Sequence, residues 1–343
     1  TTLLVTGNVD FNGDLDVDGT TNLDVVDIDG AVDMASTLTL AGNADFNGNL
    51  DVDGTTDLDG LTVAGNLSVD GGTIKLDGNY PTGTNNVALG DIALADGSLS
   101  GGNNTAIGRS SLYSNTSGAN NTGIGSGALE NNTTAASNTA VGYHSLLANT
   151  TGAGNVAVGA LALDANTTAA NNTAVGLEGL SANTTGAGNT SVGSLALNNN
   201  TTAANNTAVG YLALTTNTTA SNNTAIGKSA LQANTTGTEN VAIGASALDA
   251  NTTGQYNTVV GTAALSTDTK GSRAVAVGYG ALNTQNFTSA TNNYNVAIGH
   301  AAGNNVSTGQ QNTFIGGLAG QLNTTGAENT AVGQSALNAN TTA

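Results

Sequence analysis

Residues 223–239, NTAIGKSALQANTTGTE, are one copy of a 17-residue unit that fills most of this 343-residue chain. Each copy contains the motif Asn-Thr-Ala-Val/Ile-Gly or a close variant, and positions in the unit are counted from the motif glycine, which is Gly227 here. Self-similarity at a fixed period is the sequence signature of a repeat architecture, so the period decides the fold before local propensity does. The motif glycine occurs 15 times, at positions 90, 108, 125, 142, 159, 176, 193, 210, 227, 244, 261, 278, 299, 316 and 333.

Two spacings between motif glycines differ from this period. Gly108 follows Gly90 one position later than the period requires, and Gly299 follows Gly278 four positions later. The longer unit contains a four-residue insertion at residues 285–288. Because an insertion into one repeat normally leaves it as a loop, we expect these residues to lie in a surface loop.

The apolar positions of the unit predict a strand and a core. The residue before the motif glycine, Ile226 in the quoted copy, is aliphatic in all 15 copies, and the residue four after the glycine, Leu231, is Leu in 13. Gly303 and Gly320 are the two exceptions. Because these positions never become polar, we expect the aliphatic residues to face inward. Alternation along residues 224–226 predicts a short strand whose middle alanine faces the opposite way.

A helix and disorder are the two alternatives to a strand. Residues 229–233 have good helix propensity, but a polar Asn-Thr-Thr-Gly turn follows after about five residues, whereas an isolated helix needs roughly 12 to 15. Registered aliphatic positions in 15 copies argue against disorder. We therefore predict an all-β parallel β-solenoid, a flat β-roll in which each unit forms one coil and coils stack about 4.8 Å apart.

Small residues predict close association between chains. Two large aliphatic side chains per coil form a thin core for so many ordered residues. Alanine occupies the third position after the motif glycine in 12 of 15 copies, and Ala225 and its equivalents form a second column of small residues. We expect this alanine face to be buried between identical rolls, in an intertwined homotrimer.

Asparagine recurs at two positions of the unit. It lies four residues before the motif glycine in 14 copies and seven residues after it in 11 copies. Stacked coils place these amides above one another, where they can form hydrogen-bonded ladders. The same residues create Asn-x-Thr glycosylation acceptors such as residues 234–236, but an acceptor that recurs with the repeat carries little independent information. We favour ladders over glycans.

The N-terminal part of the chain, residues 1–80, is a different segment. It contains 15 of the 24 acidic residues and one base, so it carries −14 of the net charge of −19. Glycine recurs there at every sixth position and apolar residues alternate with Asp, which predicts an acidic β-repeat shaft segment over residues 1–80. Pro81, the only proline, marks the junction with a β-roll of about 15 coils over residues 81–343.

The composition argues against several function classes. Five Lys and Arg residues against 24 acidic residues disfavour nucleic acid and anionic membrane surfaces as partners. The absence of cysteine excludes disulfides and thiol catalysis. No apolar run approaches the roughly 18 residues of a membrane span, and residues 1–4 lack the charged start of a signal peptide. We interpret the chain as mature, secreted by another route, or a fragment.

Asp14, Asp16 and Asp18 are weak candidates for a calcium site. They match the start of an EF-hand loop, but Val25 stands at the twelfth position, where the loop requires Glu, and no flanking helices are expected. Asp alternating with apolar residues is also typical of a solvated strand face, so we favour diffuse attraction of cations over a specific Ca²⁺ cofactor.

No catalytic or other metal-binding residues are expected. His144 and His300 stand two residues and one residue after their motif glycines, in coils far apart in the array. We interpret both histidines as surface substitutions. The glycine-rich segments lack a following lysine and helix, so they do not predict a phosphate-binding loop. The sequence therefore does not predict an enzyme.

Three segments resemble known fibrous proteins. Residues 240–244, NVAIG, resemble the head repeats of trimeric autotransporter adhesins, which form left-handed parallel β-rolls as intertwined trimers. The longer pattern of residues 206–219 is similar to repeats of bacteriophage tail-fibre and tail-spike shafts, and residues 15–21 resemble marine phage fibre proteins. The repeat period is longer than that of adhesin heads, which favours the phage fibre.

The resemblance implies a structural role. We expect a homotrimeric phage tail-fibre shaft that spans distance and supports attachment to a host surface, located on the virion. A surface filament or adhesin of a cell is the alternative, and an ice- or polysaccharide-binding solenoid is a third. The expected partners are further copies of the chain, end to end as well as side by side, and a receptor or glycan bound by a tip beyond Ala343.

Overall fold

The structure, a computed structural model, describes residues 6–7, 84–95 and 99–342. The predicted acidic shaft segment of residues 1–80 and its calcium candidates Asp14, Asp16 and Asp18 therefore lie outside the described residues, apart from Thr6 and Gly7.

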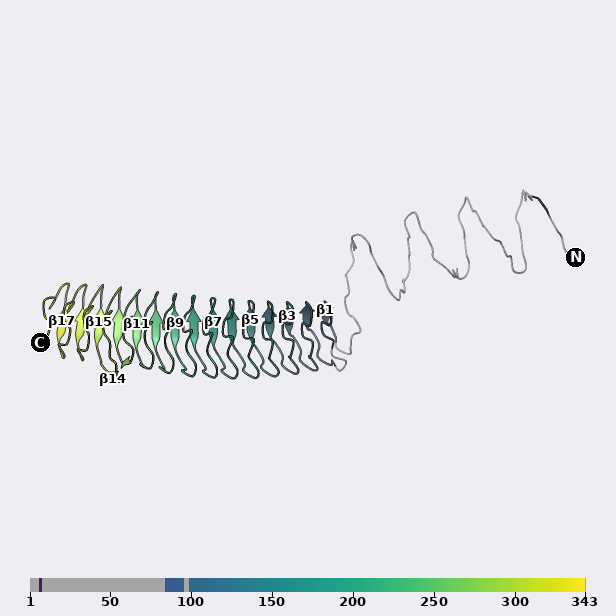
Figure 1. The fold of residues 1–343 in the computed structure, drawn as a ribbon, viewed down its shortest axis with the longest axis horizontal. Helices are drawn as coiled ribbons and strands as arrows, with labels where there is room; N and C mark the ends of the chain where they lie inside the picture. The colour runs from purple at the N-terminus through teal and green to yellow at the C-terminus, as the bar shows by residue number, and fades with distance from the viewer. Residues whose placement is uncertain (1–5, 8–83, 96–98, 343) are drawn as a thin grey trace. The chain divides into compact units, whose positions relative to one another are not determined.

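The chain divides into two units, Thr1–Asp70 and Gly71–Ala343, and the β-roll belongs to the second. One parallel sheet of 15 strands runs through this roll, and its strand order follows the sequence (Figure 1). Most paired residues are one period apart, as Val209 is from Ile226. The strands of this sheet are β1 (Val87–Leu89), β2 (Thr105–Ile107), β3 (Thr122–Ile124), β4 (Thr139–Val141), β5 (Val156–Val158), β6 (Thr173–Val175), β7 (Thr190–Val192), β8 (Thr207–Val209), β9 (Thr224–Ile226), β10 (Val241–Ile243), β11 (Thr258–Val260), β13 (Val275–Val277), β15 (Val296–Ile298), β16 (Thr313–Ile315) and β17 (Thr330–Val332).

The predicted all-β parallel solenoid with 17-residue coils is confirmed, with about 14 turns. Turns and bends connect the strands, and the elements of the described ranges include no helix. The short alanine- and leucine-containing runs therefore do not become helical, because each must reverse direction within a few residues to bring the chain back under its own strand.

Each strand ends at the motif glycine because the backbone there is left-handed. Gly227 has a φ of 135°, and a Cβ at this position would lie 2.5 Å from the carbonyl oxygen of Gly244 in the next coil. The same coil has left-handed backbone at Ser229, with φ 55°, and at Leu231, with φ 52°. Non-glycine residues at positive φ are uncommon and cost conformational energy. The coil therefore closes through left-handed residues whose energetic cost the packing of the roll must offset.

The interior is filled by leucine and alanine. Leu231, Ala230 and Ala225 are fully buried, and equivalent residues repeat this arrangement along the roll. Burial of one leucine side chain contributes about 1.5–3 kcal/mol, which is comparable with the strain of one residue at positive φ. The leucine position thus combines the largest core side chain with a strained backbone.

The predicted inward orientation of the residue before the motif glycine is wrong. Ile226 is 38% exposed, and its equivalents lie on the outer side of the sheet. Ala225, expected on a face buried between chains, is instead buried inside its own roll. The middle residue of the strand packs directly against the leucine column, where most coils have room for little more than a methyl group. The β-branched residues therefore occupy the outer side.

Two asparagine ladders run along the roll, as the sequence predicts. Asn234 donates from Nδ2 to Oδ1 of Asn217 at 3.1 Å and to the carbonyl oxygen of Gly237 at 2.9 Å. Asn223 donates from Nδ2 to the same carbonyl at 2.9 Å, and its backbone N–H donates to Oδ1 of Asn206 at 2.9 Å. The carbonyl of Gly237 thus joins the two ladders across the interior of one coil.

The ladders satisfy polar groups that would otherwise be costly to bury. Asn223 and Asn234 are buried, and an unpaired buried amide costs about 1–3 kcal/mol. Thr235 adds a parallel row, since its hydroxyl donates to the carbonyl oxygen of Thr252 at 3.0 Å. In the folded chain the Nδ2 of Asn234 is therefore occupied within the roll, which supports the ladder interpretation of its Asn-x-Thr sequence.

One pair of coils replaces the leucine column with a phenylalanine. Phe314 in β16 stands where most strands have alanine, and it is fully buried. The leucine position is Gly303 in the preceding coil and Gly320 in the same coil, and Cβ atoms there would lie 2.9 Å and 2.5 Å from the Phe314 ring. One aromatic ring therefore fills the space that two leucine side chains fill elsewhere.

Candidate functional site

The outer sheet face is the first candidate surface. We use this name for the first and third residues of the strands in the 15-stranded sheet, such as Thr224 and Ile226 of β9. The first residue is Thr or Val in every strand, and the third is Val, Ile or Leu. None of these residues is charged, although the chain has a net charge of −19. The outer sheet face is therefore an uncharged stripe along the entire sheet.

The third residues form the apolar part of this stripe. Each lies in register with the aliphatic third residue of the neighbouring strands, as Ile226 does with Val209 and Ile243. Large contiguous apolar patches on soluble proteins mark surfaces of interaction. The column is a continuous row of exposed apolar side chains, one side chain wide. Nine of its members are 36–39% exposed: Ile107, Ile124, Val158, Val175, Val192, Ile226, Ile243, Ile298 and Ile315.

Aromatic residues border the outer sheet face. Tyr143, Tyr211 and Tyr279 each follow a motif glycine directly and are exposed. Tyr143 stacks on His144 with ring centroids 3.8 Å apart, and Tyr279 stacks on His300 at 5.5 Å. The predicted surface placement of both histidines is confirmed, because His144 is partly exposed and His300 is exposed. In the part of the chain that the structure describes, no group of three His, Cys, Asp or Glu residues is arranged to hold a metal ion.

The long unit between Gly278 and Gly299 forms an irregular coil, the second candidate. Its extra residues add β14 (Thr291–Asn292), which pairs in parallel with β12 (Gly271–Ser272) of the preceding coil. The prediction that residues 285–288 form a surface loop is wrong for two of them, since Gln285 and Phe287 are buried. These two side chains fold inward because they fill polar and apolar space in the roll, and the exposed loop comes later, at residues 288–290.

Asp268 connects the irregular coil to the asparagine ladder. It stands at a ladder position, is fully buried, and accepts hydrogen bonds from Gln285 Nε2 at 2.7 Å, Gly271 N at 2.9 Å and Phe287 N at 3.0 Å. Burial away from water raises the pKa of the Asp268 carboxyl, and these hydrogen bonds partly offset the rise. Burial raises the pKa of the partly buried Asp164 as well.

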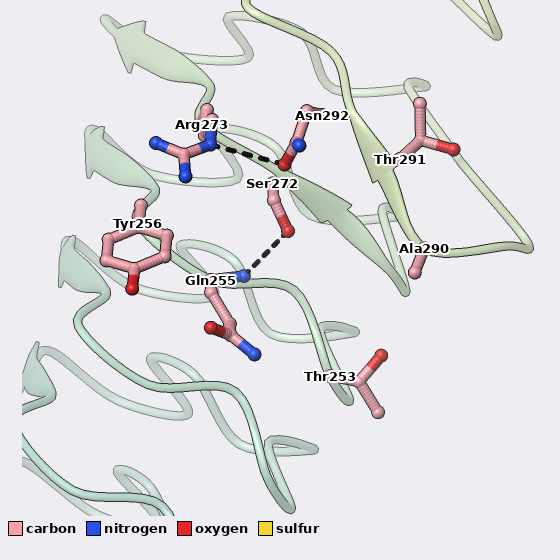
Figure 2. A pocket seen from close by; sticks show the side chains of 8 residues that line it. All are labelled: Thr253, Gln255, Tyr256, Ser272, Arg273, Ala290, Thr291 and Asn292. Atoms are coloured by element: carbon pink, nitrogen blue, oxygen red, sulfur yellow. Dashed lines mark hydrogen bonds between the residues drawn. The ribbon is translucent and has the colours of Figure 1, made fainter.

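A cavity of about 290 Å³ lies beside the irregular coil. Figure 2 shows Tyr256 and Arg273 on one side of it and Thr291 on the other, with Ser272 between them. The Arg273 guanidinium carbon lies 4.7 Å from the centroid of the Tyr256 ring. The sequence motifs do not predict these residues as a site, although the position five before the motif glycine is Tyr, Arg and Tyr in three successive copies.

In the described ranges, no helix has the length and hydropathy needed to cross a bilayer. Comparisons of the chain with protein-family models, curated proteins and solved structures find no match.

Proposed function

We propose that the chain is a structural fibre protein, the shaft of a phage tail fibre, whose rolls associate as a homotrimer through the outer sheet face. The observation that supports this proposal is the uncharged aliphatic stripe along the 15-stranded sheet. Removing a row of β-branched side chains from water contributes about 25 cal/mol per Å² of apolar area, and no charged residue on the stripe opposes that burial. Three such stripes facing a common axis would bury one another.

The geometry of the roll suits a rod. Fifteen strands at about 4.8 Å spacing give a length of roughly 70 Å. Coil-to-coil hydrogen bonds from the backbone, the asparagine ladders and the threonine row resist bending at every step, as Asn234 and Thr235 illustrate. A rod of this kind transmits position and force over distance, which is the task of a fibre shaft.

The proposed location, outside the cell on a virion, rests on the resemblance to phage fibre repeats. A cell-surface filament or adhesin with the same roll is the alternative owner. Immuno-electron microscopy with antibodies against the folded β-roll separates the two, because labelled fibres attached to virions support the phage proposal and labelled filaments on cells contradict it.

Association is tested directly by mass. Three chains of 33.3 kDa form a particle three times heavier than a monomer, which native mass spectrometry and sedimentation distinguish. Val192→Asp places a charge on the outer sheet face and should dissociate the trimer, and Val192→Thr, with nearly the same shape, should weaken it less. The matched control is Thr185→Asp, which adds the same charge at an exposed position away from that face.

Circular dichroism of each variant shows whether the roll itself remains folded. A wild-type chain that is monomeric at micromolar concentration would contradict the association proposal, as would a Val192→Asp variant that stays trimeric.

A specific observation also favours an ice-binding surface as a second candidate. Ten of the 15 first strand positions are threonine, from Thr105 to Thr330, on the same flat face as the aliphatic column. Thermal hysteresis of the wild-type chain that Val192→Asp abolishes would support this candidate, and absence of hysteresis would remove it.

A further inference from the structure

One column of side chains changes character along the roll. The residue five before the motif glycine has left-handed backbone in every coil, and in the first nine coils it is Asn, Ser or Gly. Asn222, with φ 63°, is typical. Three large residues occupy this position in successive coils further along: Tyr256, Arg273 and Tyr294. These residue types are uncommon at positive φ, so local backbone preference does not account for them.

Arg273 lies between the two tyrosines with its donors largely unused. Its guanidinium carbon is 4.7 Å from the centroid of Tyr256 and 6.0 Å from that of Tyr294. Its Nε donates to Oδ1 of Asn292 at 3.3 Å, which orients the group toward the loop of the irregular coil. Within residues 84–95 and 99–342, Arg273 forms no ion pair, and its terminal nitrogens have no hydrogen-bond partner. The exposed side chain therefore presents a positioned pair of cationic donors.

The positive charge of Arg273 is unusual in this acidic chain. The chain has 5 Lys and Arg residues against 24 acidic ones, and two of the five, Lys270 and Arg273, stand three positions apart in the coil before the irregular coil. A densely charged polyanion such as duplex DNA, with about one charge per 1.7 Å of helix axis, would be strongly repelled by the net charge of −19. A short ligand with at most one carboxylate per sugar unit meets the guanidinium with a smaller long-range penalty.

The cavity supplies the remaining contacts. Its volume of about 290 Å³ is at the small end of the roughly 300–1,000 Å³ of ligand pockets, which suits one ring-sized unit. The Oγ of Ser272 accepts a hydrogen bond from the backbone N–H of Gln255 at 3.0 Å, so the hydroxyl proton of Ser272 stays available to a ligand. Thr253 and Thr291 add hydroxyl groups to the lining, and the exposed ring of Tyr256 offers apolar surface beside them.

We propose that this cavity binds a carboxylated sugar unit, a hexuronic acid residue of an acidic polysaccharide. The carboxylate accepts two hydrogen bonds from the terminal nitrogens of Arg273, the bidentate geometry for which guanidinium is suited. The sugar hydroxyls bond to Ser272 and Thr291, and a C–H face of the ring packs against Tyr256, the tyrosine of the lining. The side wall of the roll would then hold a glycan independently of any tip.

This inference goes beyond the fibre proposal and does not depend on it, because the cavity is formed by adjacent coils of one chain. Binding can therefore be measured whether or not the chain forms trimers or belongs to a virion.

The test is isothermal titration of the full chain with trigalacturonic acid. Its methyl ester, which lacks the charges, and sodium sulfate, which lacks the sugar, are the comparison ligands. Arg273→Gln removes the cation. Glutamine fits the left-handed backbone at this repeat position, because Gln311 occupies the equivalent position two coils later. Arg109→Gln is the matched control. Arg109 is an exposed arginine near the first strands of the roll, far from the cavity, and it contacts Asp91. Tyr256→Asn introduces the residue typical of the column.

We expect trigalacturonic acid to bind the wild-type chain and the Arg109→Gln variant equally. Its binding to Arg273→Gln should be at least tenfold weaker, and so should binding of the methyl ester to the wild-type chain. Tyr256→Asn should weaken binding of the trisaccharide severalfold. Each variant is checked by circular dichroism for an intact roll. Absence of binding, equal binding by Arg273→Gln, or sulfate that binds as tightly as the trisaccharide would each overturn the proposal.

Discussion

At the scale of single residues, two features of each coil are set by backbone conformation and close approach. Gly227 has φ 135° and lies against the backbone of the next coil, whereas Leu231 accepts φ 52° because its side chain is in the core. The motif position therefore requires glycine because a side chain would clash with the next coil, and the position of Leu231 favours leucine because its side chain fills the core.

Gly227→Ala should destabilise the roll by about 2–6 kcal/mol, the combined cost of overpacking and of a strained φ. The matched control is Gly317→Ala, because a Cβ at Gly317 meets no atom within 4 Å and alanine occupies the same repeat position at Ala160 and Ala245. The control should change the unfolding free energy by less than about 1 kcal/mol. Chemical unfolding followed by circular dichroism measures both, and equal effects would contradict the steric explanation.

Asp268 should make the stability of the roll depend on pH. Its folded-state pKa is raised by burial above the unfolded value of roughly 3.9, so below that pH the group is protonated in both states. As pH rises, the unfolded chain ionises first, and stability falls until the folded-state pKa has been passed. The contribution of Asp268 should therefore lower the melting temperature of the wild-type chain as the pH rises between pH 3 and pH 8. In Asp268→Asn the melting temperature should fall less over the same range.

Asp91→Asn controls for the change in net charge, since Asp91 is an exposed carboxylate. Equal flattening of the pH profile in both variants would argue against a contribution of the buried group at Asp268.

At the scale of the element, the repeating coil tolerates substitution when volume is conserved across neighbouring coils. Phe314 occupies an alanine position only where Gly303 and Gly320 replace two leucines. Core packing density is thus maintained between positions that are not adjacent in sequence.

Phe314→Ala should cost about 3–5 kcal/mol, because a cavity remains beside the two glycines. Adding Gly320→Leu to that variant restores the usual pair of residues and should recover much of the loss. Gly320→Leu alone should destabilise the roll, since its Cβ would lie 2.5 Å from the Phe314 ring. Unfolding midpoints of the four proteins form a double-mutant cycle, and a double variant no more stable than Phe314→Ala would exclude this compensation.

The coil also shows which features of the fold are predictable from the sequence and which are not. The period and the alternation at residues 224–226 predicted strand, turn and parallel stacking, and the recurrence of Asn234 predicted a ladder. The predicted inward orientation of Ile226 was wrong. An aliphatic residue in every copy shows that the position must be apolar, but it does not show whether the side chain lies in the core or on the outer side of the sheet. The four-residue insertion predicts a loop for Gln285 and Phe287, but hydrogen bonds to Asp268 in the coil before hold this segment inward, and the insertion itself carries no sign of that partner. The Arg273 site becomes visible only when successive copies are aligned.

At the scale of the whole molecule, the roll is a one-dimensional stack in which each coil contacts its neighbours. Stability is then approximately a sum of coil and interface contributions. The uncharged outer sheet face runs along the entire stack, so association between chains should survive the removal of any one coil, whereas a charge introduced into the face, as in Val192→Asp, opposes its burial.

Deleting residues 190–206, one full coil, joins Asn189 to Thr207 and preserves every column. We expect the shortened chain to fold, to keep its oligomeric state and to melt within a few degrees of the wild-type chain. Deleting residues 198–205, half a coil, leaves too few residues to return to the sheet and should lower the melting temperature more. Calorimetry compares the two, and equal losses would contradict the stacking description.

The axial ladders also define how the rod would respond to tension. From Asn132 to Asn251 each amide of this ladder donates a hydrogen bond to the amide one coil before it, so the hydrogen bonds lie along the direction of pulling and give way one coil at a time. Each 17-residue coil releases about 56–61 Å of extended chain in exchange for its rise of about 4.8 Å. In an optical trap the rod would lengthen in equal steps, and it would dissipate a sudden pull coil by coil instead of snapping.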